Sequence, residues 1–67
     1  MDVKYILDTD TLLINFTDKR VAETKDVNEN LLIELDKDGN LVSMTIEHAK
    51  RQMDVDNFSF QKVADIV

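Results

Sequence analysis

The stretch IELDKDGNLVSMTIEHA, residues 33–49, decides the fold. Apolar and polar residues alternate on both sides of Asp36-Lys37-Asp38-Gly39, and Val42, Met44 and Ile46 fall on one face of the second segment. A period of two on both sides of a turn that contains Gly is typical of a β-hairpin. Asp, Asn and Gly suit such a turn because they accept positive φ and bond to nearby backbone. We therefore predict a hairpin here.

The same residues also begin like a calcium-binding loop, because Asp36-x-Asp38 would supply its first oxygen ligands. An EF-hand loop needs Gly at its sixth position, an oxygen ligand at its ninth and a closing Glu at its twelfth. Glu47 stands at the twelfth position, but Leu41 and Met44 occupy the sixth and the ninth. The pattern favours the hairpin turn, and we expect no calcium site.

The remaining segments extend the pattern in both directions. Residues 3–7, 12–16, 21–27 and 31–35 have the alternation or composition of strands, separated by turn-forming residues. The third of them is mostly polar, as expected of an edge strand guarded by charge. Residues 47–53 consist mainly of good helix formers, and Ala49 and Met53, four residues apart, would face the sheet. These segments predict an α+β fold in a single domain, 1–67: a small antiparallel β-meander of four to five strands (1–46), then one or two short C-terminal helices (47–67).

Residues 54–67 are open to two interpretations. Phe60, Val63, Ala64 and Val67 have helical spacing, with Ser59 in place as an N-cap, whereas residues 58–61 alternate like a strand. We favour a helix from Ser59 onward. The apolar residues of this segment either cover the open face of their own sheet or contact another protein chain. If they contact another chain, the partner-binding residues are Phe58, Phe60, Val63, Ile66 and Val67.

Composition excludes several classes of protein. The 67 residues include no Cys, so disulfides and thiolate–metal sites are ruled out. Acidic residues outnumber basic ones by 14 to 8, for a net charge of -6, which disfavours direct binding to nucleic acid. No apolar run is long enough to cross a membrane, and Met1–Lys4 lacks the layout of a signal peptide. We expect a cytoplasmic protein, whose acidity serves solubility or steers it toward a basic partner protein.

No residue pattern indicates an enzyme. Asp8, Asp10, Asp36 and Asp38 lie in predicted turns, where solvent keeps carboxylates ordinary. The single histidine, His48, has no serine or cysteine arranged beside it, because Ser43 and Ser59 lie in no nucleophile motif. One Gly cannot build a phosphate-binding loop. We expect no catalytic residue, no cofactor and no metal.

Three motifs together resemble a known family. They are Tyr5-x-x-Asp8-x-x-x-Leu12-x-Ile14-x-Phe16, then Val21-x-x-Thr24-x-x-Val27, then Asp36-x-Asp38-Gly39-x-Leu41-Val42-x-Met44-x-Ile46-x-x-Ala49. This pattern, which spans residues 5–49, is similar to the bacterial domain-of-unknown-function family numbered 2283. The chain departs from the family pattern at Leu7, at Thr11, where Asp is usual, and at Ser43, where Gly is favoured.

The resemblance implies a β-meander followed by a helix, and it implies no catalytic residues. Members of the family look like the acidic antitoxin half of some two-gene toxin–antitoxin modules, whose other half resembles a small basic ribonuclease toxin. The leading hypothesis is therefore an antitoxin-like module that neutralises a basic toxin-like partner by direct binding. The alternative is a homo-oligomeric structural or ligand-binding domain that pairs with a second copy of itself.

Overall fold

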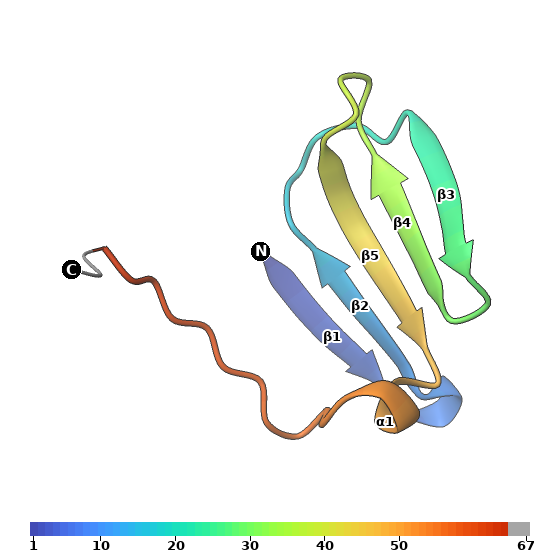
Figure 1. Ribbon diagram of the computed structural model, residues 1–67, viewed down its shortest axis with the longest axis vertical. Helices are drawn as coiled ribbons and strands as arrows, with labels where there is room; N and C mark the ends of the chain where they lie inside the picture. The colour runs from blue at the N-terminus through green and yellow to red at the C-terminus, as the bar shows by residue number, and fades with distance from the viewer. Residues whose placement is uncertain (65–67) are drawn as a thin grey trace.

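A computed structural model describes residues 1–64 of the protein. Five strands form one antiparallel sheet in the order β1-β2-β5-β4-β3, seen side by side in Figure 1. A three-residue 3₁₀ turn, η1 (Leu7–Thr9), connects the first two strands, and one short helix follows the last. The elements are β1 (Asp2–Ile6), β2 (Thr11–Asn15), β3 (Glu23–Asn28), β4 (Leu31–Leu35), β5 (Leu41–Glu47) and α1 (Ala49–Gln52). The fold is therefore mostly β, with a single helix of one turn among the described residues.

The sheet joins a hairpin, β1–β2, to a three-stranded unit, β3–β4–β5. Because β2 pairs with β5, the connection of residues 16–22 passes β5 and β4 and leads to β3 at the far edge of the sheet (Figure 1). The predicted antiparallel meander is confirmed, and this central pairing is the one place where neighbouring strands are not consecutive. The exposed strand β3, which carries Glu23, Lys25 and Asp26, forms one edge of the sheet, as its charge predicts.

The Asp36–Asn40 segment is the predicted hairpin turn. Gly39 has a φ of 82°, and its N–H donates to the carbonyl oxygen of Asp36 over 3.0 Å. The Asp36 carboxylate accepts hydrogen bonds from the backbone N–H groups of Asp38 and Asn40, both at 2.9 Å. This carboxylate satisfies the amides of its own turn, which explains why a charged side chain is 7% exposed.

The strand register lines up apolar side chains in two rows across four strands on one face of the sheet. We call this surface the apolar face. The covered row consists of Tyr5, Leu12, Ile46 and Leu31, and the open row consists of Val3, Ile14, Met44 and Ile33. Side chains at the intervening positions point to the opposite face, where Lys4, Leu13, Thr45 and Leu32 form the corresponding row.

The main cluster of the core lies at the α1 end of the apolar face, and Val42 of β5, 4% exposed, is buried separately from it. Leu12 and Ile46, of the covered row, are 6% and 7% exposed, and they pack with Ala49 of α1, which is fully buried. Val55, which follows the helix, packs against the same cluster. The small side chain of Ala49 lets α1 approach the sheet closely. The single turn of α1 and Val55 together cover this end of the sheet.

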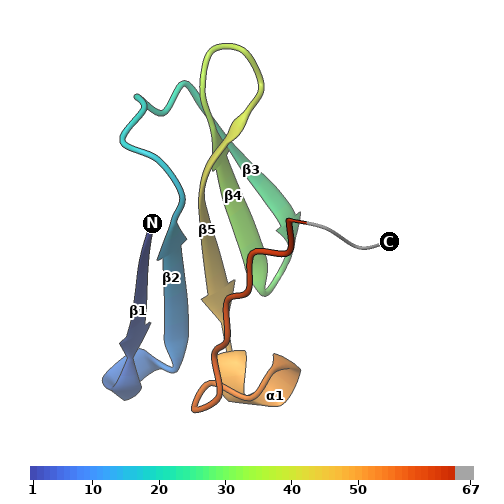
Figure 2. The ribbon, with the colours of Figure 1, turned by 90° about the vertical axis from the view of Figure 1, so that its left-hand side faces the viewer.

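The C-terminal segment differs from its prediction. The helix favoured from Ser59 onward is wrong over residues 59–64, which have no regular secondary structure, and the strand interpretation of residues 58–61 is not observed either. The helical segment proposed for 47–67 is limited to α1. Figures 1 and 2 show that the chain runs extended from α1 past the β1 edge, so these residues do not form the packed helix that their apolar spacing predicts.

Candidate protein-binding surfaces

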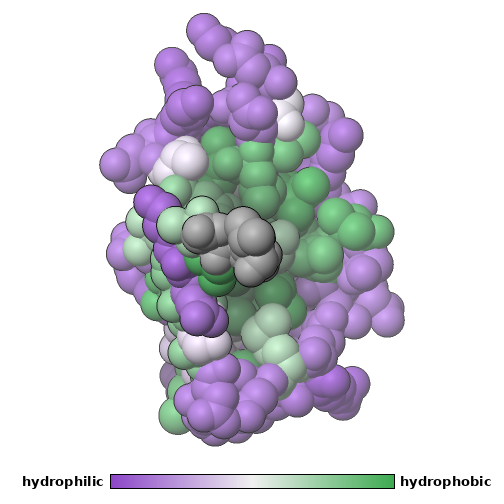
Figure 3. Space-filling model, turned by 60° about the vertical axis from the view of Figure 1, so that its left-hand side comes forward, coloured by the Kyte–Doolittle hydropathy of each residue, from purple (hydrophilic) through white to green (hydrophobic). Residues whose placement is uncertain are grey.

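The open row gives the molecule an apolar surface next to its small core. Ile14 and Met44 touch the core cluster from the side, whereas Val3 is 37% exposed and Ile33 is half-buried. Figure 3 shows a broad hydrophobic surface in this region with hydrophilic residues around it. An apolar face of this extent on a sheet one layer thick is typical of a surface that binds another protein.

The second apolar surface is the C-terminal tail, which we define as residues 58–64. Phe58, Phe60 and Val63 are 60%, 71% and 55% exposed. These are three of the five residues predicted to bind a partner, and the structure places them on one extended segment with none of them in the core. The other two, Ile66 and Val67, lie outside the described residues.

The base of the tail is held in place by its own contacts. Asp54 accepts hydrogen bonds from the backbone N–H of Asp56 over 3.2 Å and from the Asn57 side-chain amide over 2.6 Å. Val55, between them, packs on the core cluster. The tail therefore leaves the sheet from a fixed point, and its exposed aromatic side chains are presented at a defined edge of the molecule.

Asp10 connects α1 to the rest of the fold. Its carbonyl oxygen accepts a hydrogen bond from the N–H of Ala49 over 3.0 Å, and its carboxylate accepts from the N–H of Lys50 over 3.1 and 3.3 Å. The first amides of a helix have no partner within the helix, and an acceptor carboxylate near them is stabilising. Asp10 thus caps a helix whose bonded amide, that of Lys50, lies forty residues later, and its own φ of 53° is one that Asp tolerates.

A hydrogen bond joins Asp10 to the covered row. The hydroxyl of Tyr5 donates to Oδ1 of Asp10 over 2.6 Å. This bond raises the pKa of Tyr5 to about 12, because ionised tyrosine could no longer donate to the carboxylate. The same bond, followed by the hydrogen bond from the Lys50 amide, lowers the pKa of Asp10 from its ordinary value. The arrangement keeps the carboxylate charged and occupied as a structural cap.

The other candidate catalytic groups are also engaged in turns. Asp36 has a lowered pKa, chiefly because of the hydrogen bond from the Asn40 amide, and Lys19 lies 3.9 Å from its carboxylate. His48 adopts a left-handed conformation with a φ of 54°, and its Nδ1 donates to the Asn30 side-chain oxygen over 2.9 Å. Among residues 1–64, no three His, Cys, Asp or Glu side chains gather to hold a metal ion.

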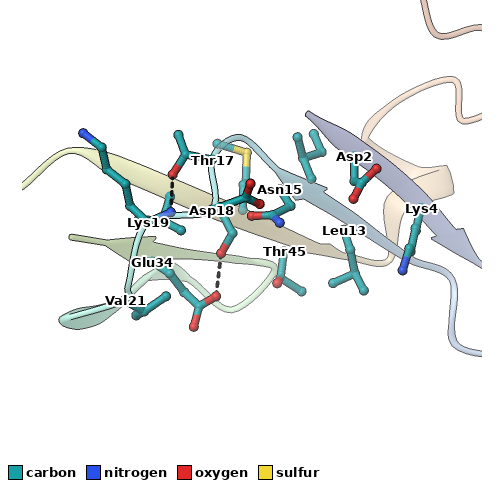
Figure 4. Close-up of a pocket in the computed structure, with 14 residues that line it drawn as sticks. Asp2, Lys4, Leu13, Asn15, Thr17, Asp18, Lys19, Val21, Glu34 and Thr45 are labelled. Carbon is teal, nitrogen blue, oxygen red and sulfur yellow. Dashed lines mark hydrogen bonds between the residues drawn. The ribbon is translucent and has the colours of Figure 1, made fainter.

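A groove of about 500 Å³ lies on the opposite face of the sheet, beside the connection that follows β2 (Figure 4). Two hydrogen bonds lie in its lining: the Ser43 hydroxyl donates to Glu34, and the Lys19 N–H donates to the Thr17 hydroxyl oxygen. Charged side chains of both signs line it. The lining residues are Asp2, Lys4, Leu13, Ile14, Asn15, Thr17, Asp18, Lys19, Val21, Glu34, Val42, Ser43, Met44 and Thr45.

Two features of these surfaces were not visible to the sequence analysis. The Tyr5–Asp10–α1 contact joins residues forty positions apart, and no local pattern signals a helix cap supplied from such a distance. The alternation in β1, β2, β4 and β5 predicts the apolar side chains of the open row. How far these side chains are buried depends on where α1 and the tail lie. No described helix has the length and apolar character needed to cross a membrane.

Comparison with known proteins identifies the family of the chain. The model of a family described as "Protein of unknown function (DUF2283)" matches residues 2–50, which include the whole sheet and the start of α1. The chain belongs to this family. No curated protein and no solved structure matches it. The match ends before the tail, so the exposed aromatic residues lie outside the matched region.

Proposed function

We propose that this member of the DUF2283 family is a non-catalytic protein-binding module, antitoxin-like, that neutralises a basic ribonuclease-like toxin by direct binding. The observation that carries the proposal is the tail, which holds Phe58 and Phe60 in an extended conformation with most of their surface in water. Burial of a large apolar side chain gains about 1.5–3 kcal/mol. Two such side chains on one strand-like segment therefore supply a substantial part of an interface, because aromatic anchors dominate binding energy.

Charge supports a basic partner. The chain carries a net charge of -6, and Asp54 and Asp56 stand at the base of the tail. Complementary charge raises the rate of encounter and selects among partners, while the buried anchors supply the affinity. A small basic ribonuclease matches both requirements, because its RNA-binding surface must be positive to hold phosphates. An acidic chain that covers such a surface would block access of RNA.

Co-purification with matched variants tests the proposal. The full chain, tagged at its N-terminus, is expressed in its native host beside a Phe58→Ser/Phe60→Ser variant and a Leu7→Ser control. Leu7 is 70% exposed, which matches Phe60, but it lies in η1 away from the tail. We expect mass spectrometry to find a small basic protein with the wild-type chain and the Leu7→Ser control, and to find it lost from the double variant.

A second measurement connects binding to function. The basic protein recovered in this way is purified alone and assayed for ribonuclease activity with and without the full chain. We expect activity alone and its loss on addition of one equivalent of chain. Absence of a basic protein from the wild-type preparation, equal retention by the double variant, or a partner without ribonuclease activity would each contradict the proposal.

A further inference from the structure

The tail has the sequence pattern of a β-strand but pairs with no strand of the described chain. Phe58 and Phe60 alternate with Ser59 and Gln61, which puts aromatic side chains on one side of an extended backbone and polar side chains on the other. No backbone hydrogen bond joins the tail to another part of the described chain, and Figure 1 shows it running clear of the edge strand β1. The tail contains no proline, so each of its amides is able to donate a hydrogen bond.

Burial of the two aromatic rings in a partner has a consequence for the backbone between them. In an extended chain Phe58 and Phe60 lie about 7 Å apart on the same side, with the peptide groups of Ser59 between them. A partner that covers both rings also takes these peptide groups out of water. A buried N–H or C=O without a hydrogen bond is costly, and an extended chain has no internal partner for it. The partner protein must therefore supply the hydrogen bonds.

We propose that the tail binds by strand addition, in which residues 58–64 pair as an extra β-strand with an exposed sheet edge of the partner. This inference rests on the proposed function and specifies its partner more narrowly. A sheet edge presents a row of unpaired N–H and C=O groups at the spacing of an extended chain. Backbone pairing then supplies affinity, and the aromatic side chains supply specificity by filling pockets beside that edge. The partner is a basic protein whose sheet has a free edge next to apolar pockets.

The conformation of the tail favours a strand over a helix bound in a groove. A helix that begins after Ser59 brings Phe60 and Val63 to one face but leaves Phe58, which is 60% exposed, outside the helix. A strand uses Phe58 and Phe60 on the same side. The tail is already extended, and Val55 at its base is packed on the core cluster, so strand addition requires little ordering of the chain on binding.

Amide hydrogen exchange of the full chain tests the inference. Isotopically labelled chain is measured alone and with one equivalent of the basic protein that co-purifies with it. Alternate N–H groups of an added strand face the partner. We therefore expect exchange to slow about 100-fold or more at every second residue of the tail in the complex, and at no residue of the tail in the chain alone.

Three other exchange patterns would overturn strand addition. Slow exchange at consecutive residues of the tail would show a bound helix. Unchanged exchange throughout the tail would show that only side chains enter the partner. Slow exchange in the chain without its partner would show that the tail pairs within its own protein or with a second copy of it.

Proline variants at neighbouring positions give an independent measurement of binding. The N–H groups of Gln61 and Lys62 point to opposite sides of an added strand, so only one of them bonds to the partner. Proline removes that N–H, but it is tolerated on an edge strand where the N–H faces solvent. We expect either Gln61→Pro or Lys62→Pro to weaken binding about tenfold or more relative to the alanine variant at the same position, and the other to match its alanine control. Ser59→Pro should behave as Gln61→Pro does.

These measurements separate the inference from the proposed function. A basic ribonuclease that the chain inhibits, and that binds all three proline variants as tightly as their alanine controls, would leave the proposed function standing and overturn strand addition. A partner with alternating protection of the tail but no ribonuclease activity would support strand addition and contradict the proposed function. Recovery of no basic protein would overturn both.

Discussion

The two rows of the apolar face have nearly the same composition but different surroundings. In the covered row, Leu12 and Ile46 pack with Ala49 of α1 and are almost completely buried, while Tyr5 and Leu31 at its two ends are partly buried. The open row begins with Val3 at 37% exposed, and its Ile14 and Met44 are partly buried against the edge of the same cluster. The most complete burial on this face therefore lies where α1 packs on the sheet. Apolar alternation builds the face, and the short reach of the helix decides which part is closed.

The largest expected effect lies in the covered row. Ile46→Ala removes a side chain that is 7% exposed and packed between Leu12 and Ala49. Cavity formation at such a site costs about 2–5 kcal/mol of unfolding free energy. In the open row, Ile33→Ala should cost less, because Ile33 is only partly buried. Urea unfolding of both variants makes the comparison. Equal losses would show that the two rows are equally buried and would break the distinction.

Asp10 holds α1 over the covered row through its hydrogen bonds to the helix, and the pKa of Tyr5, which donates to the same carboxylate, shows whether this contact is formed. Tyr5 is the single tyrosine, so near-ultraviolet absorbance follows its ionisation alone. We expect a pKa of about 12 in the folded chain, in place of the ordinary 10.0, because of the hydrogen bond to Asp10. A pKa raised by folding contributes stability below pH 10, and that stability is lost as the pH rises toward 12. In Asp10→Asn we expect the pKa of Tyr5 to return toward 10. An unchanged pKa would mean that the hydrogen bond between Tyr5 and Asp10 is not formed in the folded chain.

A smaller loss is expected at the hairpin turn between β4 and β5. Gly39 has a φ of 82°, and a Cβ at this position would meet no atom within 4 Å. The cost of Gly39→Ala is therefore one of backbone conformation alone, about 1 kcal/mol. Gly39→Asn should cost less, because Asn tolerates a left-handed conformation. Thermal unfolding measures both, and a stability for Gly39→Ala equal to that of the wild type would contradict the positive φ.

The smallest expected effect concerns the tail. A chain that ends at Asn57 keeps Val55 on the core, and the described residues that it loses, 58–64, lie outside the core, so we expect a change in unfolding free energy below about 0.5 kcal/mol. A chain that ends at Asp54 also loses Val55 and should be less stable by about 1 kcal/mol, since Val55 is partly buried. Circular dichroism during urea unfolding compares the two. Unfolding of the longer fragment would show that the tail belongs to the core, as the sequence analysis allowed.

Features that depend on residues close together in the sequence were predictable, and features that depend on distant residues were not. The strands, the Gly39 turn and the charged edge at β3 depend on alternation, φ and local hydrogen bonds, so neighbouring residues reveal them. The helix from Ser59 failed because an apolar stripe forms a stable helix only when a surface receives it, and residues 58–64 extend away from the sheet. Asp10, as the cap of α1, escaped notice because its partner amides lie forty residues away.

The most direct test of the difference between the two rows is a map of contacts within the folded chain. Nuclear Overhauser effects between side chains are recorded on isotopically labelled protein. The account predicts effects from Ile46 to the methyl groups of Ala49 and Val55, because these residues pack in one cluster. It predicts none from Ile33 to the ring of Phe60, which is 71% exposed. Effects between Ile33 and Phe60 would contradict the account.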